Sequence, residues 1–352
     1  MRPTQSLQNA GQSIWLDNIT RGMLGSGELQ RYVDELSVTG LTSNPSIFQK
    51  AFTETSDYQS AIAAAETSSP EELFMQLAIE DLQAAADVFA DVHARTDGVD
   101  GWVSLEVSPL LAYDAQSTIE AAVEVHQRLA RPNVFIKIPG TPQGLPAVEE
   151  AIYRGIPVNV TLLFSLQQYL DCVAAYQRGI TRRIAAGLDA DVASVASVFI
   201  SRWDAAVVGR VPAELTGKLA LAVGESVHHA YARMLNDTTQ QAIATSGGRP
   251  QRLLFASTST KDPSASDTVY VEGLIAPNTI NTMPDATLQA FADHGRVGDI
   301  LDGSGGTSQA TLAAFAEHGI DVPTLGVELQ EQGAQAFVQA WQDLMAVLDP
   351  GQ

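Results

Sequence analysis

The chain has 352 residues, of which 45% are hydrophobic and 17% are charged, so it can bury a large core. Its formal net charge of −21 argues against a nucleic-acid partner, because phosphate backbones are bound through clustered Lys and Arg side chains. A single cysteine, Cys172, excludes an intrachain disulfide, and no apolar stretch approaches the ~20 residues that span a bilayer, so we expect a soluble, cytoplasmic protein without a membrane partner.

Short apolar runs alternate with longer segments of helical periodicity along the whole chain. The predicted strands are residues 13–18, 38–44, 102–107, 133–139, 156–164, 196–202, 252–258 and a weaker 279–283. The predicted helices are residues 27–36, 70–94, 115–130, 144–155, 166–187, 285–295 and 327–348, with a long helical stretch over 212–245. Eight such alternating units predict an α/β protein, a parallel sheet closed into a (β/α)8 TIM barrel. An open, doubly wound sheet is the alternative.

No Pro-, Gly- or Ser-rich linker divides the chain. We therefore expect a single barrel domain over residues 1–352, since such barrels commonly exceed about 250 residues. The amphipathic segment at about 327–348 is predicted to be an additional terminal helix that packs on the barrel.

Side chains alternate along a strand, so one parity faces the outer helices and the other faces the barrel interior. In the fourth strand, Val134, Ile136 and Ile138 form a branched apolar face, which leaves Phe135 and Lys137 pointing inward. A lone lysine in a strand is more often a surface residue, so this placement needs support from its neighbours.

Polar side chains are predicted on the inner face near the carboxyl ends of several other strands. They are Asp17, Glu106, Asn159, Thr161, Ser197 and Ser257, with Phe199 beside them and Asn44 at the end of the second strand. In the seventh strand the same rule puts Leu254 and Ala256 outward. Singly, an Asp or Asn at a strand end is more often a cap or turn residue. Together they favour a site, because isolated polar groups inside a barrel are costly and barrel enzymes place their chemistry at this end.

The set suits covalent catalysis by an amine. Burial among apolar walls can lower a lysine pKa by up to about 3–5 units, and a neutral Lys137 would attack a ketone to form an iminium. The iminium then serves as the electron sink for cleavage of a carbon–carbon bond, as in a class I aldolase. Glu106 and Asp17 are the candidate acid/base groups, with a plain buried ion pair to Lys137 as the alternative for each.

An anionic group on the substrate would be bound by Arg202 with the Ser257 hydroxyl. Lys261, in the loop STSTKDP, is either a second cation of that site or simply solvated. A metal site is not expected: His228 and His229 are adjacent on a helix and so point about 100° apart, and no zinc-ligand spacing occurs.

Eight segments of the chain resemble transaldolases, particularly the longer-chain bacterial branch. In order they are SIWLDNITR, VTGLTSNPSIF, SLEVSP, VFIKIPGT, VNVTLLFS, SVFISRWD, LLFASTSTKDP and INTMP. The resemblance covers nearly the whole chain. It implies transfer of a dihydroxyacetone unit from sedoheptulose 7-phosphate to glyceraldehyde 3-phosphate, which gives erythrose 4-phosphate and fructose 6-phosphate in the non-oxidative pentose phosphate pathway. It implies no cofactor and no metal.

By this resemblance Lys137 is the Schiff-base lysine, Glu106 is the carboxylate that works through a bound water, and Thr161 is the hydroxyl partner of Glu106. Asp17 is similar to the second acid/base carboxylate. The positions similar to the family's substrate-binding residues are Asn44 and Asn159 for the dihydroxyacetone unit, Ser197, Arg202 and Ser257 for phosphate, and Phe199 next to the Schiff base. The chain departs from the best-known pattern at Ser259, where an arginine is usual, and Lys261 is the residue that would restore the charge.

Fructose-6-phosphate aldolases share the barrel and the lysine, and they are the closest alternative. Those shorter relatives tend to carry Gln where this chain has Glu106 and Tyr where it has Phe199, so both positions favour transfer. A catalytically silent sugar-phosphate-binding barrel is a further alternative, and the presence of the lysine and its carboxylates counts against it. A class II metal aldolase is another, and the absence of a histidine ligand set counts against it. The sequence leaves open whether the protein is a monomer or a homodimer.

Overall fold

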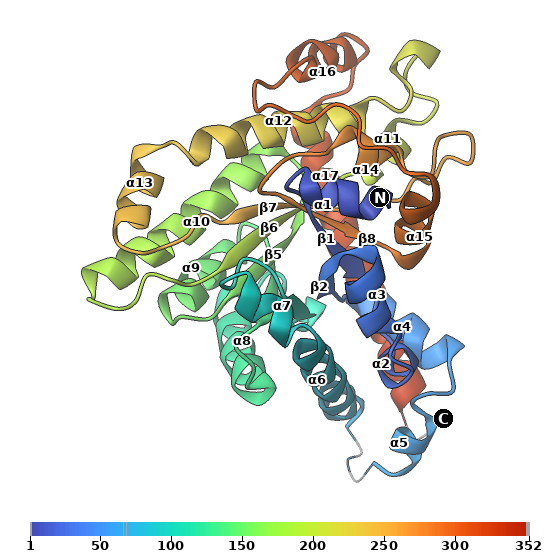
Figure 1. The fold of residues 1–352 in the computed structure, drawn as a ribbon, viewed down its shortest axis with the longest axis vertical. Helices are drawn as coiled ribbons and strands as arrows, with labels where there is room; N and C mark the ends of the chain where they lie inside the picture. Colours follow the sequence, from blue (N-terminus) through green and yellow to red (C-terminus); the bar gives the residue numbers. More distant parts are fainter. Residues whose placement is uncertain (1, 66, 68, 350–352) are drawn as a thin grey trace.

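The protein is described here from a computed structural model, in which residues 2–65, 67 and 69–349 are placed. Eight parallel strands form a closed barrel in the order of the sequence (Figure 1). The strands are β1 Ser13–Asp17, β2 Val38–Thr42, β3 Trp102–Glu106, β4 Val134–Pro139, β5 Val158–Leu163, β6 Ser194–Phe199, β7 Arg252–Ala256 and β8 Ile280–Met283. The predicted (β/α)8 barrel is confirmed, and each predicted strand coincides with an observed one. The two ends of the predicted domain, residue 1 and residues 350–352, lie outside the described residues.

Helices surround the barrel and add to it at both ends. They are α1 Pro3–Asn9, α2 Arg21–Gly25, α3 Glu28–Leu36, α4 Pro45–Glu54, α5 Gln59–Ala63, α6 Pro70–Val88, α7 Ala90–Arg95, α8 Ala115–Leu129, α9 Leu145–Tyr153, α10 Leu166–Ala185, α11 Arg202–Val207, α12 Leu219–Met234, α13 Thr238–Thr245, α14 Val269–Gly273, α15 Asp285–His294, α16 Ser308–Glu317 and α17 Val322–Leu348, with 3₁₀ turns η1 Pro109–Leu111 and η2 Ala213–Leu215. Within the described part of the chain, no helix is both long and apolar enough to cross a membrane.

Helix starts follow local capping chemistry. Several helices begin after a residue whose side-chain oxygen accepts a hydrogen bond from a backbone N–H of the first turn. These capping residues are Thr20, Asn44, Ser69, Asp114, Ser165, Asp237 and Asp321. At Ser165 the bond is reciprocal, because Gln168 also binds the Ser165 backbone N–H. The cap at Asp237 explains why the helical stretch predicted over 212–245 is wrong as one element: α13 begins there anew, after α12 and a turn.

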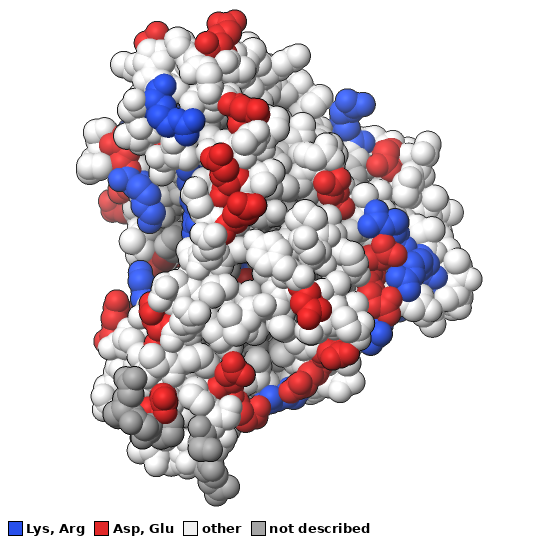
Figure 2. Space-filling view, turned by 180° about the vertical axis from the view of Figure 1, so that it is seen from behind, with Lys and Arg blue, Asp and Glu red and all other residues white. Residues whose placement is uncertain are grey.

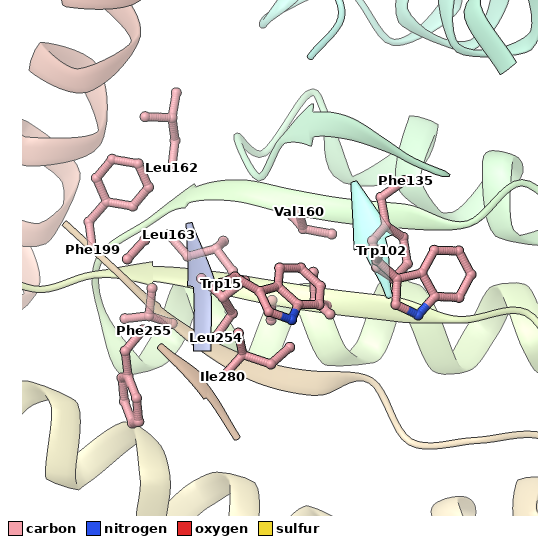
Figure 3. Packing of buried hydrophobic residues seen from close by; sticks show 14 of the residues in the cluster. Trp15, Trp102, Phe135, Val160, Leu162, Leu163, Phe199, Leu254, Phe255 and Ile280 are labelled. Atoms are coloured by element: carbon pink, nitrogen blue, oxygen red, sulfur yellow. The ribbon is translucent and has the colours of Figure 1, made fainter. Parts of the chain in front are cut away.

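The floor of the barrel interior is aromatic. The rings of Trp102 and Phe135 stack with their centroids 4.1 Å apart, and Trp15 lies 6.1 Å from Phe135. Figure 3 shows Trp15 between this pair and Phe199. Gly40 makes room for the layer, since a Cβ atom there would lie 2.6 Å from the Trp15 indole. Polar side chains two residues further along the same strands therefore stand on a packed apolar base.

Strand register brings the predicted catalytic residues together. Glu106 pairs with Lys137 across β3 and β4, and Lys137 pairs with Asn159 across β4 and β5. These three side chains therefore occupy one row at the carboxyl end of the barrel, as the alternation rule predicts.

The predicted orientation of β7 is wrong. Arg252, at the opposite end of the strand, donates to the Asp100 carboxylate and to the Ser13 hydroxyl, and Ala256 lines the cavity described below. Leu254 and Ala256 therefore share the inner parity. Ser257 still reaches the cavity because its backbone has a left-handed φ of 57°, which interrupts the alternation.

The last helix lies across the barrel rather than only beside it. Helix α17 contacts α4 and α6, which follow β2, η1, which follows β3, and the strand β5 (Figure 1). It begins at Val322, five residues before the predicted start, with Asp321 as its cap.

Candidate active site

A cavity of about 200 Å³ opens at the carboxyl ends of the strands. Nine of the eleven predicted site residues line it: Asp17, Asn44, Lys137, Thr161, Ser197, Phe199, Arg202, Ser257 and Lys261. The other two, Glu106 and Asn159, are buried and contact lining residues directly. The structure thus brings the whole predicted set to one place.

Lys137 and Glu106 form the centre of this site. The Lys137 Nζ lies 3.2 Å from the Glu106 Oε2 and donates to the backbone carbonyl of Ser43 at 2.8 Å. Both side chains are almost fully buried. Burial raises the pKa of the Glu106 carboxyl, the positive charge of Lys137 opposes that rise, and the nearby Asp17 adds to it. The carboxyl is therefore suited to both accepting and returning a proton beside the amine.

Asp17 is the second acidic group, and it is held by a chain of hydroxyls. The Thr42 Oγ1 donates to the Asp17 Oδ1 at 2.7 Å and lies 2.7 Å from the Thr282 Oγ1. Because Thr42 has one hydroxyl proton, its contact with Thr282 makes Thr282 the donor there. Desolvation raises the pKa of Asp17, whereas the Lys137 charge and the Thr42 hydrogen bond lower it.

Amide and hydroxyl groups occupy the side of β5 and β6. The Asn159 amide donates to the Ser104 Oγ at 3.1 Å and accepts from the Ser197 Oγ at 2.6 Å. Thr161 lines the cavity, yet its buried Oγ1 has no hydrogen-bond partner among the described residues. A buried hydroxyl of this kind is suited to holding a water or a substrate oxygen.

Asn44 has two roles at once. Its side-chain oxygen caps α4 by accepting from the backbone N–H of Ile47 at 3.0 Å, and the residue also lines the cavity. Serving as a helix cap therefore does not exclude Asn44 from the cavity.

Cationic groups stand at the other side of the cavity. Arg202 begins α11, and its guanidinium carbon lies 5.8 Å from the centre of the Phe199 ring. Desolvation lowers its pKa, with no compensating carboxylate among the described residues. The Ser257 Oγ lies 2.9 Å from the Ser201 Oγ, and the exposed Lys261 completes this side.

Most arginines of the described residues form an ion pair with a carboxylate, and Arg202 does not. On the face drawn in Figure 2, acidic side chains are spread widely and basic ones mostly stand beside them. Arg128 and Arg182, for example, each contact two glutamates. The free guanidinium of Arg202 in a cavity thus favours an anionic ligand.

The described residues contain no cluster of three or more His, Cys, Asp or Glu side chains that could hold a metal ion. His228 is buried and His229 bonds the Gly303 carbonyl at 2.6 Å, so the two histidines do not converge. A larger groove of about 1,030 Å³, between α10, α12, α16 and α17, contains none of the predicted site residues and is lined mainly by apolar side chains.

Several contributors to the site were missed by sequence reasoning, among them Thr42, Ser104, Thr282 and Phe337. Thr42 and Ser104 carry the inward parity on predicted strands, so the alternation rule could have found them. Thr282 belongs to the weakest predicted strand. Phe337 lines the cavity from α17, far along the chain, and no local sequence signal points to it.

Known transaldolases are similar to this chain over nearly its whole length. A family model described as transaldolase/fructose-6-phosphate aldolase matches residues 14–348. A transaldolase of Neisseria gonorrhoeae is 44% identical over 341 residues, which cover 96% of this chain and 97% of that protein. A transaldolase of Saccharopolyspora erythraea is 41% identical over 350 residues, covering 97% and 95%. Transaldolase 2 of a Nostoc species is 39% identical over 364 residues, covering 97% and 96%.

Proposed function

The chain belongs to the transaldolase/fructose-6-phosphate aldolase family, and we propose that it transfers dihydroxyacetone between sugar phosphates through a Schiff base on Lys137. The donor is sedoheptulose 7-phosphate and the acceptor is glyceraldehyde 3-phosphate, with erythrose 4-phosphate and fructose 6-phosphate as products. The observation that carries the proposal is the buried pair of Lys137 Nζ and Glu106 Oε2, 3.2 Å apart on an aromatic floor.

The first half-reaction begins with attack of the Lys137 amine on the ketone carbon of the donor. Glu106, directly or through one water, supplies the proton that lets the carbinolamine lose its oxygen as water, which forms the iminium. Asp17 then takes the proton of the C4 hydroxyl as the C3–C4 bond breaks. The bonding electrons move into the iminium and give an enamine, and erythrose 4-phosphate leaves.

The second half-reaction reverses these steps with a new aldehyde. The enamine carbon attacks the aldehyde carbon of glyceraldehyde 3-phosphate, and Asp17 returns its proton to the new hydroxyl. Water then adds to the iminium, and the amine of Lys137 is regenerated as fructose 6-phosphate departs. Asn44, Asn159 and Thr161 hold the three-carbon unit and the water between the two halves.

The phosphate of each sugar is assigned to Ser197, Arg202 and Ser257, with the exposed Lys261 as a further cation of the cavity. Arg202 supports this assignment because it faces the cavity without a carboxylate partner among the described residues. We place the protein in the cytoplasm, as one domain and as either a monomer or a homodimer.

Release of free dihydroxyacetone, as in a fructose-6-phosphate aldolase, is the second candidate. It requires water to protonate the enamine before an aldehyde arrives. The apolar Phe199 beside the cavity carries no proton that could be given to the enamine, which favours transfer. A silent sugar-phosphate-binding barrel is a third candidate.

Trapping with borohydride separates the two enzymes from the silent barrel, and an assay of free dihydroxyacetone separates transfer from aldol cleavage. The protein is incubated with fructose 6-phosphate and borohydride, and the adduct is located by peptide mass spectrometry. We expect a reduced three-carbon adduct on Lys137 that is absent from Lys137→Ala and retained in Lys261→Ala, a variant of another lysine of the cavity. A folded protein that binds sugar phosphate without an adduct would establish the silent barrel instead. Free dihydroxyacetone formed at the same rate with and without acceptor would establish the aldolase.

A further inference from the structure

Gln330 of α17 is a buried polar residue that binds the barrel rather than its own helix. Only 5% of its surface is exposed. Its Nε2 donates to the Gly140 carbonyl at 3.0 Å and to the Leu162 carbonyl at 2.9 Å. Both hydrogens of the amide are therefore used on the backbone at the ends of β4 and β5.

Both carbonyls belong to residues that are direct neighbours of Thr161. The Gly140 N–H donates to the Thr161 carbonyl at 2.7 Å, and Leu162 is the next residue along the chain. The Leu162 backbone has a left-handed φ of 59°, and the pairing of β5 with β6 shifts register between Val160 and Leu163. A leucine in this conformation persists only where its surroundings hold it. The Gln330 amide, on the carbonyl of that peptide, is such a support.

We infer that Gln330 is a positioning residue for the reaction: it fixes the irregular end of β5 and thereby the direction of the Thr161 hydroxyl. Gln330 does not line the cavity, so it acts through Thr161 and not on the substrate. Thr161 in turn presents a buried Oγ1 that has no partner among the described residues. The inference rests on the proposed function, in which this hydroxyl works with Glu106 beside Lys137.

Position 12 offers a matched control. Gln12 is also fully buried, and its Nε2 donates to the Leu274 carbonyl at 2.7 Å and to the Thr279 Oγ1 at 2.9 Å. It directly precedes β1, at the amino-terminal end of the barrel and away from the cavity. Methionine has the length and shape of glutamine without its donors, so Gln330→Met and Gln12→Met each remove two buried hydrogen bonds at similar volume.

The first test compares activity in the two variants. We expect Gln330→Met to lower kcat and the rate of borohydride trapping by about 10- to 100-fold, since a shift of about 1 Å at a reacting group can cost 10²-fold. KM should change little because the phosphate side is untouched. Gln12→Met should keep the wild-type kcat, with a fall in melting temperature similar to that of Gln330→Met. Equal kcat in the two variants overturns the inference.

A double-mutant cycle tests whether the effect passes through Thr161. If it does, Thr161→Ala combined with Gln330→Met is no slower than Thr161→Ala alone. If the rate reductions of the two single variants multiplied in the double variant, Gln330 would act by another route and the inference would be overturned.

Hydrogen exchange gives a readout that does not depend on catalysis. We expect faster exchange of the backbone amides at 161–163 in Gln330→Met and unchanged exchange there in Gln12→Met. Failure of the proposed function would remove the trapped adduct from the wild type as well. Failure of this inference alone would leave the wild-type adduct intact while exchange at 161–163 stays the same in Gln330→Met.

Discussion

The Glu106 Oε2 lies 3.2 Å from the Lys137 Nζ, and both side chains are buried in the barrel. In the proposed mechanism a carboxyl at this distance serves the proton transfers of carbinolamine dehydration, and such transfers typically contribute about 10²–10⁴-fold. Glu106→Gln keeps the shape and loses the transferable proton, so kcat should fall by about that factor in a coupled assay of fructose 6-phosphate formation. Glu225→Gln is the control, because burial also raises the pKa of Glu225 but that residue is outside the cavity. A kcat within about threefold of wild type would contradict the role of Glu106.

The acidic limb of the rate profile should report Asp17. The Thr42 hydrogen bond lowers the Asp17 pKa, so Thr42→Val should raise it and move the acidic limb of kcat to higher pH. Thr39→Val, a buried threonine of the same strand that bonds the Ile14 carbonyl, should leave the limb in place. Coincident profiles for Thr42→Val and the wild type would remove Asp17 from the rate-determining proton transfer.

The raised pKa of Asp17 also predicts how the free energy of unfolding depends on pH. Because its pKa is higher in the folded protein than in the unfolded chain, the folded state binds the proton more tightly. The free energy of unfolding therefore decreases as the pH rises from the unfolded pKa, ~3.9, toward the folded one. Asn cannot ionise, so Asp17→Asn should gain stability relative to the wild type as the pH rises above about 4, as measured by urea unfolding.

A carboxylate with the opposite shift is the control for that experiment. The Arg131 guanidinium lowers the pKa of Asp87, so that side chain stabilises the folded protein when it is ionised. Asp87→Asn should therefore be less stable than the wild type above about pH 5, by a difference that shrinks as the pH falls through and below the unfolded pKa of ~3.9. If the stability of Asp17→Asn and that of Asp87→Asn, each relative to the wild type, changed with pH in the same direction, the assignment of a raised pKa to Asp17 would be contradicted.

Arg202 should determine binding of the phosphate group. Hydrogen bonds to charged groups contribute about 1.5–3 kcal/mol, which corresponds to roughly 10- to 100-fold in affinity. We expect Arg202→Ala to raise the KM of both sugar phosphates, and the dissociation constant of inorganic phosphate measured by calorimetry, by about that factor. Arg210→Ala, an exposed arginine of the following turn, should change neither.

The strands could be predicted from sequence because their apolar and polar residues alternate. This rule oriented Lys137 and Glu106 from a few neighbouring residues. It failed in β7, where Leu253, Leu254, Phe255 and Ala256 are all apolar and both parities look alike. Ser257 lines the cavity although its strand was oriented wrongly, because a left-handed backbone conformation at Ser257 interrupts the alternation, and the sequence carries no sign of that conformation.

Helix boundaries were harder to predict than strand orientation. The predicted helix over 70–94 is two helices, α6 and α7, which meet at Phe89 without a proline or glycine to mark the break. Helix α4 was missed because its cap, Asn44, was interpreted as the end of a strand. Gln330 and Phe337 carry no local signal, because what gives them their roles is contact with distant parts of the chain.

The hydrogen bond from Gln330 to Leu162 joins residues 168 positions apart. Translation runs from the amino terminus, so the strands that bear Glu106, Lys137 and Thr161 emerge long before the helix that holds the end of β5. Because the contact is long-range in sequence, its formation requires the closure of a long loop, which costs entropy. During synthesis the reactive Lys137 is therefore made before the Gln330 side chain that supports the end of β5.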